Sequence, residues 1–322
     1  ESATVTQPEN IFSCYEIVEQ TQWIAGVCDR FLRYVTTSTP EQFGAFERAL
    51  YELEPVERTL NTWIDSLKRN DIQEKKCAAE LQRSIALLTH LAETLIPVEL
   101  ATYADELCMR AAMTQTYIDH AAATLARVRG LLQERLSRGV KTEVTNSEVD
   151  GEKEEKKEEE VVEEEGVFFL NKSESLIGQA RGQRVVITKV LRSLEELRSR
   201  SLALSGDAAG PFEKAEQTAQ ELAALGRRIG DSVMELLGEE GRTEPITYAE
   251  ALTRMNQSAD STARNLGVEK EAGSDAMAVM SAGLRSLAGL LESLSGHAGD
   301  LTRTGEFERG SNSKAPWALR AA

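Results

Sequence analysis

The residues of this chain that could do chemistry are few and far apart. Its three histidines are His90, His120 and His297, and none belongs to a His-Glu-x-x-His or Glu-x-x-His pattern. Zinc proteases and di-iron bundle proteins take metal ligands from those patterns. We therefore expect ordinary surface or core histidines and no metal site.

The usual nucleophile and phosphate-binding motifs are missing as well. The sequence has no glycine-rich phosphate loop, no Gly-x-Ser-x-Gly turn and no Cys-x-x-Cys pair. These motifs mark the commonest NTPases, hydrolases, and redox or zinc-ribbon proteins. We therefore expect no enzyme activity and no cofactor, and we assign no catalytic, cofactor-binding or metal-binding residue.

The cysteines are expected to be buried, reduced thiols. Cys14, Cys28, Cys77 and Cys108 each lie on or beside an apolar helical face. No signal peptide is recognisable, and no uncharged apolar run approaches the 18 or so residues of a membrane span. The sequence thus predicts a cytosolic protein without a transmembrane segment or disulfides. It begins at Glu1, without an initiator Met, and we expect a domain excised from a longer chain.

The charge of the chain is strongly negative and unevenly placed. A net charge of -16 argues against nucleic acid or an anionic membrane as the main partner. Residues 152–165 contain nine Glu and three Lys. Such a run predicts a solvated, disordered spacer, which we place at 139–166; the alternative is an acidic tail that docks onto a basic partner.

The elements around these residues have helical periodicity. Apolar residues recur every three or four positions, which predicts amphipathic helices. The first stripe consists of Leu53, Val56, Leu60, Trp63, Ile64 and Leu67, the second of Ala78, Leu81, Ile85, Leu88, Ala92 and Leu95, and the third of Leu107, Ala111, Thr114, Ile118, Ala121, Leu125, Val128 and Leu132. The third alternates strictly by four and three, as helices packed along one another do.

Helix bounds follow from the prolines and glycines. A first helix over about 9–35 would carry Ile11, Val18, Ala25, Leu32 and Val35 on one face, which Trp23 and Phe31 widen. A short helix over about 41–53 should end before Pro55, because proline is tolerated in the first turn of the next helix. A long helix from about 98 to 137 should end at Arg138-Gly139.

The second half repeats the helical pattern. Four seams of apolar residues, separated by Gly- and Pro-containing breaks, predict four helices between about 187 and 301. Gly226 and Gly230 are spaced to let another helix approach closely. The apolar run Val167 to Leu170 is interpreted as a docking or helix-entry segment rather than a strand.

The fold class predicted is all-α, with antiparallel helical bundles in two subdomains. Aromatic residues are scarce, at 5%, and no strand is predicted. The first bundle would span 1–138, the acidic linker 139–166, the second bundle 167–304, and an exit linker with the start of a coiled coil 305–322.

Three segments carry a resemblance to a known family. They are YELEPVERTLNTWIDSLKRNDI from Tyr51, AAELQRSIALLTHLAETL from Ala78, and ADELCMRAAMTQTYIDHAAATLARVRGLLQ from Ala104. Their order resembles the helical domain between the two coiled coils of the Glued-type large subunits of dynactin. Near the end, Gly305 to Phe307 and APWALRAA from Ala315 resemble that family's exit into its second coiled coil.

This resemblance implies a non-catalytic scaffold that supports dynein-driven transport on microtubules and links it to cargo. The partners it implies are other dynactin subunits, cytoplasmic dynein and cargo adaptors, with a homodimer in the parent protein and a cytoplasmic, cytoskeletal location. The alternative is a helical bundle of an unrelated membrane-trafficking tether, which would present a groove to a short partner helix. The sequence assigns no partner-binding residues, because such residues look like ordinary surface.

Overall fold

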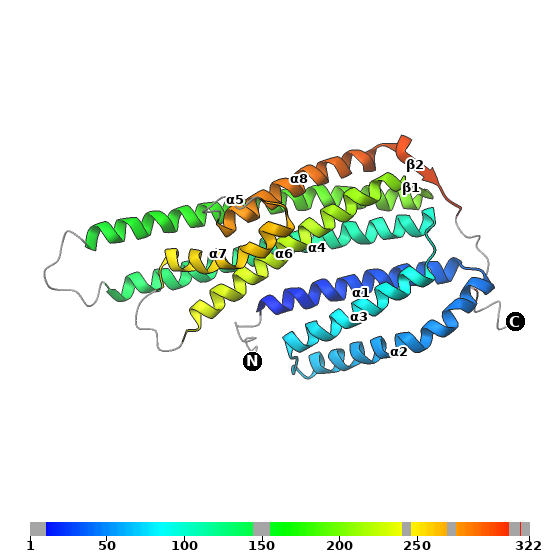
Figure 1. Ribbon diagram of the computed structural model, residues 1–322, viewed down its shortest axis with the longest axis horizontal. Helices are drawn as coiled ribbons and strands as arrows, with labels where there is room; N and C mark the ends of the chain where they lie inside the picture. The colour runs from blue at the N-terminus through cyan, green and yellow to red at the C-terminus, as the bar shows by residue number, and fades with distance from the viewer. Residues whose placement is uncertain (1–10, 144–154, 240–245, 269–274, 309–315, 317–322) are drawn as a thin grey trace. The chain divides into compact units, whose positions relative to one another are not determined.

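The protein is almost entirely helical, as the sequence predicts. The computed structural model describes residues 11–143, 155–239, 246–268, 275–308 and 316, with side chains described for these residues apart from 48, 135–143 and 155–165 (Figure 1). This part holds eight α-helices and one pair of short strands. None of its helices is long and apolar enough to cross a membrane.

The first four helices are α1 (Ile11–Thr37), α2 (Pro40–Lys68), α3 (Glu74–Leu95) and α4 (Leu100–Glu143). A capping box starts α2: the Thr39 hydroxyl accepts from the Gln42 amide, and the Gln42 side chain accepts from the Thr39 amide at 2.8 Å. Asn70, which has a φ of 56°, lies in the turn that follows α2. The chain then reverses, so that α2 and α3 lie side by side (Figure 1).

The remaining helices are α5 (Glu155–Ser199), α6 (Ala209–Leu237), α7 (Tyr248–Asn265) and α8 (Ala276–Gly299). Short 3-10 turns at Gly206–Ala208 and Leu301–Arg303 precede α6 and follow α8.

Two short strands correct the prediction that the chain has none. Strand β1 (Leu202–Leu204) pairs antiparallel with β2 (Thr304–Glu306), with Ala203 opposite Gly305. The ladder extends where the Ser205 amide donates to the Arg303 carbonyl at 2.8 Å. Strands of three residues show no usable alternation, and the partner lies about a hundred residues away, so the sequence pattern misses them.

Pro55 lies inside α2, so the prediction of two helices here is wrong. A mid-helix proline removes one backbone hydrogen bond and bends the helix, and α2 is visibly curved in Figure 1. Ala49, Val56 and Trp63 are buried at heptad spacing on both sides of the proline. The burial of these three residues on one side keeps α2 a single continuous helix and offsets the free-energy cost of the proline.

The predicted face of α1 is wrong in part: Trp23 and Phe31 pack against the core cluster, but Val18, Ala25 and Leu32 are exposed. The helix buries Phe12, Ile24 and Val27, whereas Val18 is 51% exposed and Leu32 is 61% exposed. Apolar residues line more than one side of α1, and the side with the larger aromatic rings is the one covered. Larger side chains release more free energy on burial, which favours this choice.

The third stripe is confirmed. All eight of its residues on α4 are at most 2% exposed. The predicted end at Gly139 is wrong, however, because α4 continues to Glu143. A single glycine costs only about 1 kcal/mol in a helix interior and does not force an end.

The acidic segment differs from the prediction of a spacer over 139–166. Helical backbone covers 139–143 at the end of α4 and 155–166 at the start of α5. Glu and Lys are good helix formers, so a helix can begin within the acidic run. Residues 144–154, at the centre of the predicted spacer, lie outside the described residues. Val167 to Leu170 are part of α5, with Phe169 buried.

The chain forms two compact units, each drawn from several segments. Among the described residues, unit 1 comprises those within 1–12, 116–186 and 215–291, and unit 2 those within 13–115, 187–214 and 292–322. Helices α1, α4, α5, α6 and α8 therefore contribute residues to both, α1 by its first two residues alone. The separately folding parts at 1–138 and 167–304 remain a prediction.

Unit 1 is held by close helix packing. A Cβ on Gly226 would lie 3.3 Å from Thr124 of α4, and a Cβ on Gly230 would lie 2.5 Å from the Phe12 ring. This confirms the predicted close approach at both glycines. The Gln183 side chain of α5 donates to the Leu284 carbonyl of α8, and the Ala276 amide donates to Asn256 of α7 at 2.8 Å.

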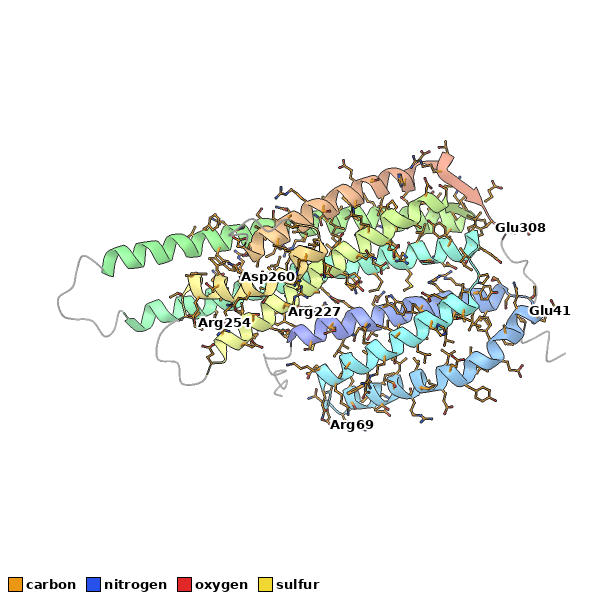
Figure 2. All side chains as sticks on the ribbon, in the orientation of Figure 1. Glu41, Arg69, Arg227, Arg254, Asp260 and Glu308 are labelled. Atoms are coloured by element: carbon orange, nitrogen blue, oxygen red, sulfur yellow. The ribbon has the colours of Figure 1, made fainter. Side chains whose placement is uncertain are left out.

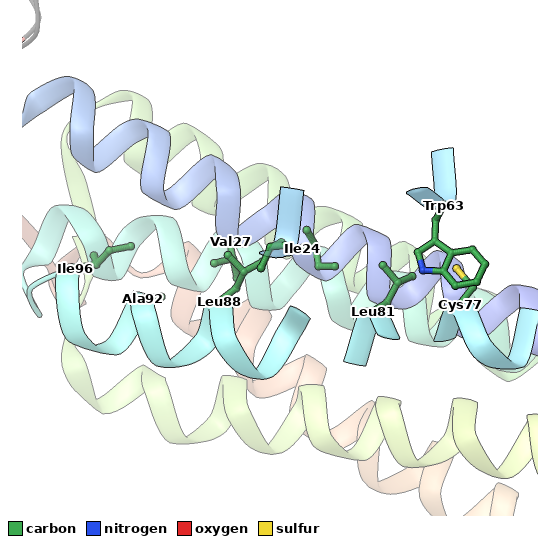
Figure 3. Packing of buried hydrophobic residues seen from close by; sticks show 9 residues of the cluster. Ile24, Val27, Trp63, Cys77, Leu81, Leu88, Ala92 and Ile96 are labelled. Carbon is green, nitrogen blue, oxygen red and sulfur yellow. The ribbon is translucent and has the colours of Figure 1, made fainter. Parts of the chain in front are cut away.

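Unit 2 has its own apolar core between α1, α2 and α3 (Figure 3). Trp63 and Cys77 lie together near one end of the cluster, and Ile96 lies at the other. The Trp63 indole donates to the Glu80 carboxylate at 2.9 Å. Phe46 of α2 packs edge-on against Phe31 of α1, with ring centroids 6.2 Å apart.

Candidate interaction surface

The chemistry-bearing side chains stay dispersed in the structure. His90 is exposed on α3, and His120 and His297 are half-buried on α4 and α8. Among the described residues, no three His, Cys, Asp or Glu side chains are grouped so that they could hold a metal ion.

The thiols are poor nucleophiles. Cys77 and Cys108 are buried, as predicted, and burial raises the pKa of each thiol to about 11, with smaller contributions from nearby carboxylates. Cys28 is exposed, so the expectation that it is buried is wrong. Partial desolvation and Asp29 still raise the pKa of Cys28. Thiols with raised pKa values are protonated at neutral pH and react slowly.

An ionic layer fixes α1 and α5 to α4 within unit 2. The Asp105 carboxylate of α4 forms ion pairs with Arg198 of α5 at 3.0 Å and with Arg33 of α1 at 3.7 Å. The neighbouring Glu106 forms an ion pair with Arg30 of α1 at 3.2 Å. Burial lowers the pKa of Arg30, and Glu106 acts against that shift. These ion pairs connect α1 and α5 to α4 along one side of α1.

The orientation of α1 leaves an apolar row uncovered. Gly26 lies against Met109 of α4, on the side of α1 that also carries the arginines. Another side carries Val18, Ala25 and Leu32, spaced seven apart and exposed. We name these three residues the α1 stripe. These residues belong to the row predicted for the core, whose other members, Ile11 and Val35, are half-buried.

A second apolar row is left uncovered on α2. Trp63 of the first predicted stripe is buried, but Ile64 is 48% exposed and Leu67 is 62% exposed, so their predicted burial is wrong. With Leu50, which is 65% exposed, and the half-buried Leu53 and Leu60, they form a row that we name the α2 stripe. Glu41 and Arg69 mark the two ends of α2 in Figure 2.

The α2 stripe follows the heptad pattern with one interruption. Its positions, together with Glu57, run 50, 53, 57, 60, 64 and 67, which alternates steps of three and four. Leu53 and Leu60 also pack against the core cluster of unit 2. The apolar face of α2 is thus wider than α1 and α3 can cover, which is the geometry of a helix with a second seam.

An open polar depression of about 380 Å³ adjoins the α2 stripe. Its lining is Glu54, Glu57, Arg58, Asn61, Thr62 and Asp65. Three carboxylates against one guanidinium give the lining a net charge of -2 at neutral pH. Arg58 bonds to Glu54 at 2.7 Å, and Lys68 bonds to Asp65 at 3.1 Å. Among the described side chains, Glu57 forms no ion pair.

Sequence reasoning assigned no partner-binding residue and so missed this surface. The signal was the width of the apolar face: positions 49, 56 and 63 form one heptad row, and positions 50, 53, 60, 64 and 67 form another beside it. The first row is buried in the core, and Leu53 and Leu60 of the second row contact that core, but Leu50, Ile64 and Leu67 stay exposed. A second row indicates a further neighbour.

Residues 1–194 match the family described as Dynactin: Dynein associated protein. The match covers more than half of the chain and contains α1 to α4 and most of α5. Both apolar stripes and the acidic depression lie within it.

Proposed function

Because the chain belongs to the dynactin family of dynein-associated proteins, we propose that it is a scaffold domain of the dynactin large subunit. In this role it supports dynein-driven transport on microtubules through protein contacts. The observation that carries the proposal is the exposed apolar surface of α1 and α2, which lies wholly within the family match.

The scaffold role follows from what the helices expose. Isolated apolar residues are normal on a protein surface, but rows that follow a heptad along a helix are typical of a surface that another helix covers. Other dynactin subunits, dynein and cargo adaptors are the proposed partners. A homodimer in the parent protein, a location in the cytoplasm on the cytoskeleton, and the absence of enzyme activity belong to the same proposal. An unrelated trafficking tether is disfavoured by the family match.

The test uses the full-length parent assembled into its complex with dynein. Residues 11–304 are deleted with the phase of any flanking coiled coils preserved, and dynein run length, adaptor recruitment and microtubule co-sedimentation are measured. Deletion should shorten runs or reduce adaptor recruitment and should leave co-sedimentation unchanged, because the resemblance places microtubule binding outside this chain.

A second experiment uses point variants that should keep the fold intact. The double variant Ile64→Ser/Leu67→Ser removes exposed apolar surface from α2, and Val185→Ser removes a similarly exposed side chain from α5 as the matched control. Reduced motility or recruitment in the double variant alone supports the α2 surface as the working part. Unchanged motility and recruitment after the deletion would reduce the domain to a spacer and sink the proposal.

A further inference from the structure

We propose that the α2 stripe and the depression beside it bind one amphipathic helix of a partner, whose apolar face is flanked by lysine or arginine. This inference rests on the proposed function and gives the chemistry of one partner. The partner is a basic helix and not a second copy of this chain.

The apolar part of the surface fits a helix. From Leu50 to Leu67 the stripe spans 17 helical steps, or roughly 26 Å at 1.5 Å per residue. A partner helix of about five turns would cover it. Alternating steps of three and four present knobs that interlock with the same alternation on another helix, whereas an extended strand has a repeat of two.

The charged part decides which helix is accepted. Glu57 occupies a place in the heptad row itself, and within the described side chains it forms no ion pair. Burying it beneath an apolar or acidic partner would strand a desolvated charge, which is costly. A lysine or arginine from the partner would neutralise Glu57, the one lining carboxylate without an ion pair among the described side chains, since Glu54 pairs with Arg58 and Asp65 with Lys68.

A second copy is a poor occupant for the same reason. A twofold contact brings the same patch of both copies together. Two α2 stripes joined in this way would carry two Glu57 carboxylates and two acidic depressions into one interface. Like charges held close disfavour that contact.

The test is direct binding of designed helices to the 322-residue chain. A basic probe is a 21-residue peptide with leucines at heptad spacing and lysines beside them. An acidic probe has the same leucines with glutamates in place of the lysines. Fluorescence anisotropy should show the basic probe binding at least about tenfold more tightly, with affinity falling as salt rises.

Three variants locate the site. Glu57→Lys should weaken the basic probe by about tenfold and strengthen the acidic one, because it reverses the charge in the row. Ile64→Ser/Leu67→Ser should weaken both probes. Val185→Ser, on α5, should change neither. Thermal unfolding followed by circular dichroism checks that each variant keeps the parent's fold.

Several results would overturn the inference. These are equal binding of the two probes, an unchanged basic-probe affinity in Glu57→Lys, or unchanged binding in the double serine variant. Sedimentation that shows a dimer abolished by Ile64→Ser/Leu67→Ser would also overturn it, in favour of a second copy as occupant.

The outcome separates this inference from the proposed function. If the basic probe binds as expected and the deletion of 11–304 leaves dynein motility and adaptor recruitment unchanged, the proposed function fails alone. If the deletion impairs motility but the basic probe has no preference for the site, the basic helix is wrong and the scaffold role stands.

Discussion

Helices α2 and α4 carry the same kind of apolar heptad and use it in opposite ways. The α4 stripe, from Leu107 to Leu132, is buried along its whole length, whereas the α2 stripe stays largely in water. Both rows predict a helix with one apolar side. The contrast teaches that a heptad determines which residues share a side, while the number of neighbouring helices determines whether that side is covered.

The thiols give the largest expected difference between covered and uncovered sides. Cys28 lies on the exposed side of α1, and Cys108 lies buried on α4. Modification of Cys108 requires opening of the fold, so at pH 8 iodoacetamide should react with Cys28 roughly 10³-fold faster or more. Mass spectrometry of timed samples measures both rates. Comparable rates in native buffer would show that α4 is not covered.

The two buried thiols, Cys77 and Cys108, should make the stability of the fold depend on pH. The pKa of Cys77 and of Cys108 in the folded chain is about 11, above the ordinary value of 9.0. The folded state therefore favours the neutral thiol, and this contribution to stability is complete below about pH 9 and is lost as the pH rises to about 11. Denaturant unfolding at pH 8 and pH 10.5 should show a smaller decline in Cys108→Ala than in the parent. An identical decline contradicts the assignment.

Within α2 itself, the two sides should respond differently to truncation. Trp63→Ala should lower the free energy of unfolding by roughly 3–5 kcal/mol, because it leaves a cavity in the core and removes the partner of Glu80. Leu67→Ala, four residues along, is the matched change on the exposed side. Urea denaturation gives both values, and a midpoint for Trp63→Ala equal to that of the parent would refute the core assignment.

Two glycine-to-alanine substitutions, each of which adds one methyl group, compare a closely packed position with an open one. Gly230→Ala would place a Cβ 2.5 Å from the Phe12 ring and should cost roughly 1–3 kcal/mol through overpacking. Gly178→Ala on α5 meets nothing within 4 Å and should instead stabilise the helix by roughly 0.5–1 kcal/mol. Thermal or urea unfolding measures the signs. Equal effects at both sites would mean that α6 does not approach Phe12 closely.

The smallest effect is expected on the α2 stripe. Leu50→Ser and Leu67→Ser remove apolar groups that are already in water, so each should change the free energy of unfolding by less than about 0.5 kcal/mol. A loss of several kcal/mol in either variant would show that α2 is covered within the chain. This surface would then be unavailable to a partner helix.

Much of the helical order could be predicted, but the choice among competing faces could not. The row on α4 lies within a wide buried face that also includes Met113 and Tyr117, so periodicity identified the buried side correctly. On α1 two apolar sides competed, and the one with Val18 and Leu32 proved to be exposed. On α2 the proline signal suggested an end, yet buried residues on both sides of Pro55 kept one helix.

By itself the sequence determined that this chain is helical, where most apolar rows lie, and that its family resemblance is to dynactin. These properties depend on local propensity and on spacing along one helix, which a single sequence contains. Only the tertiary structure decided which rows are covered, that β1 meets β2, and that Glu57 stands in an exposed apolar row. Those depend on residues distant in sequence, whose packing no local pattern records.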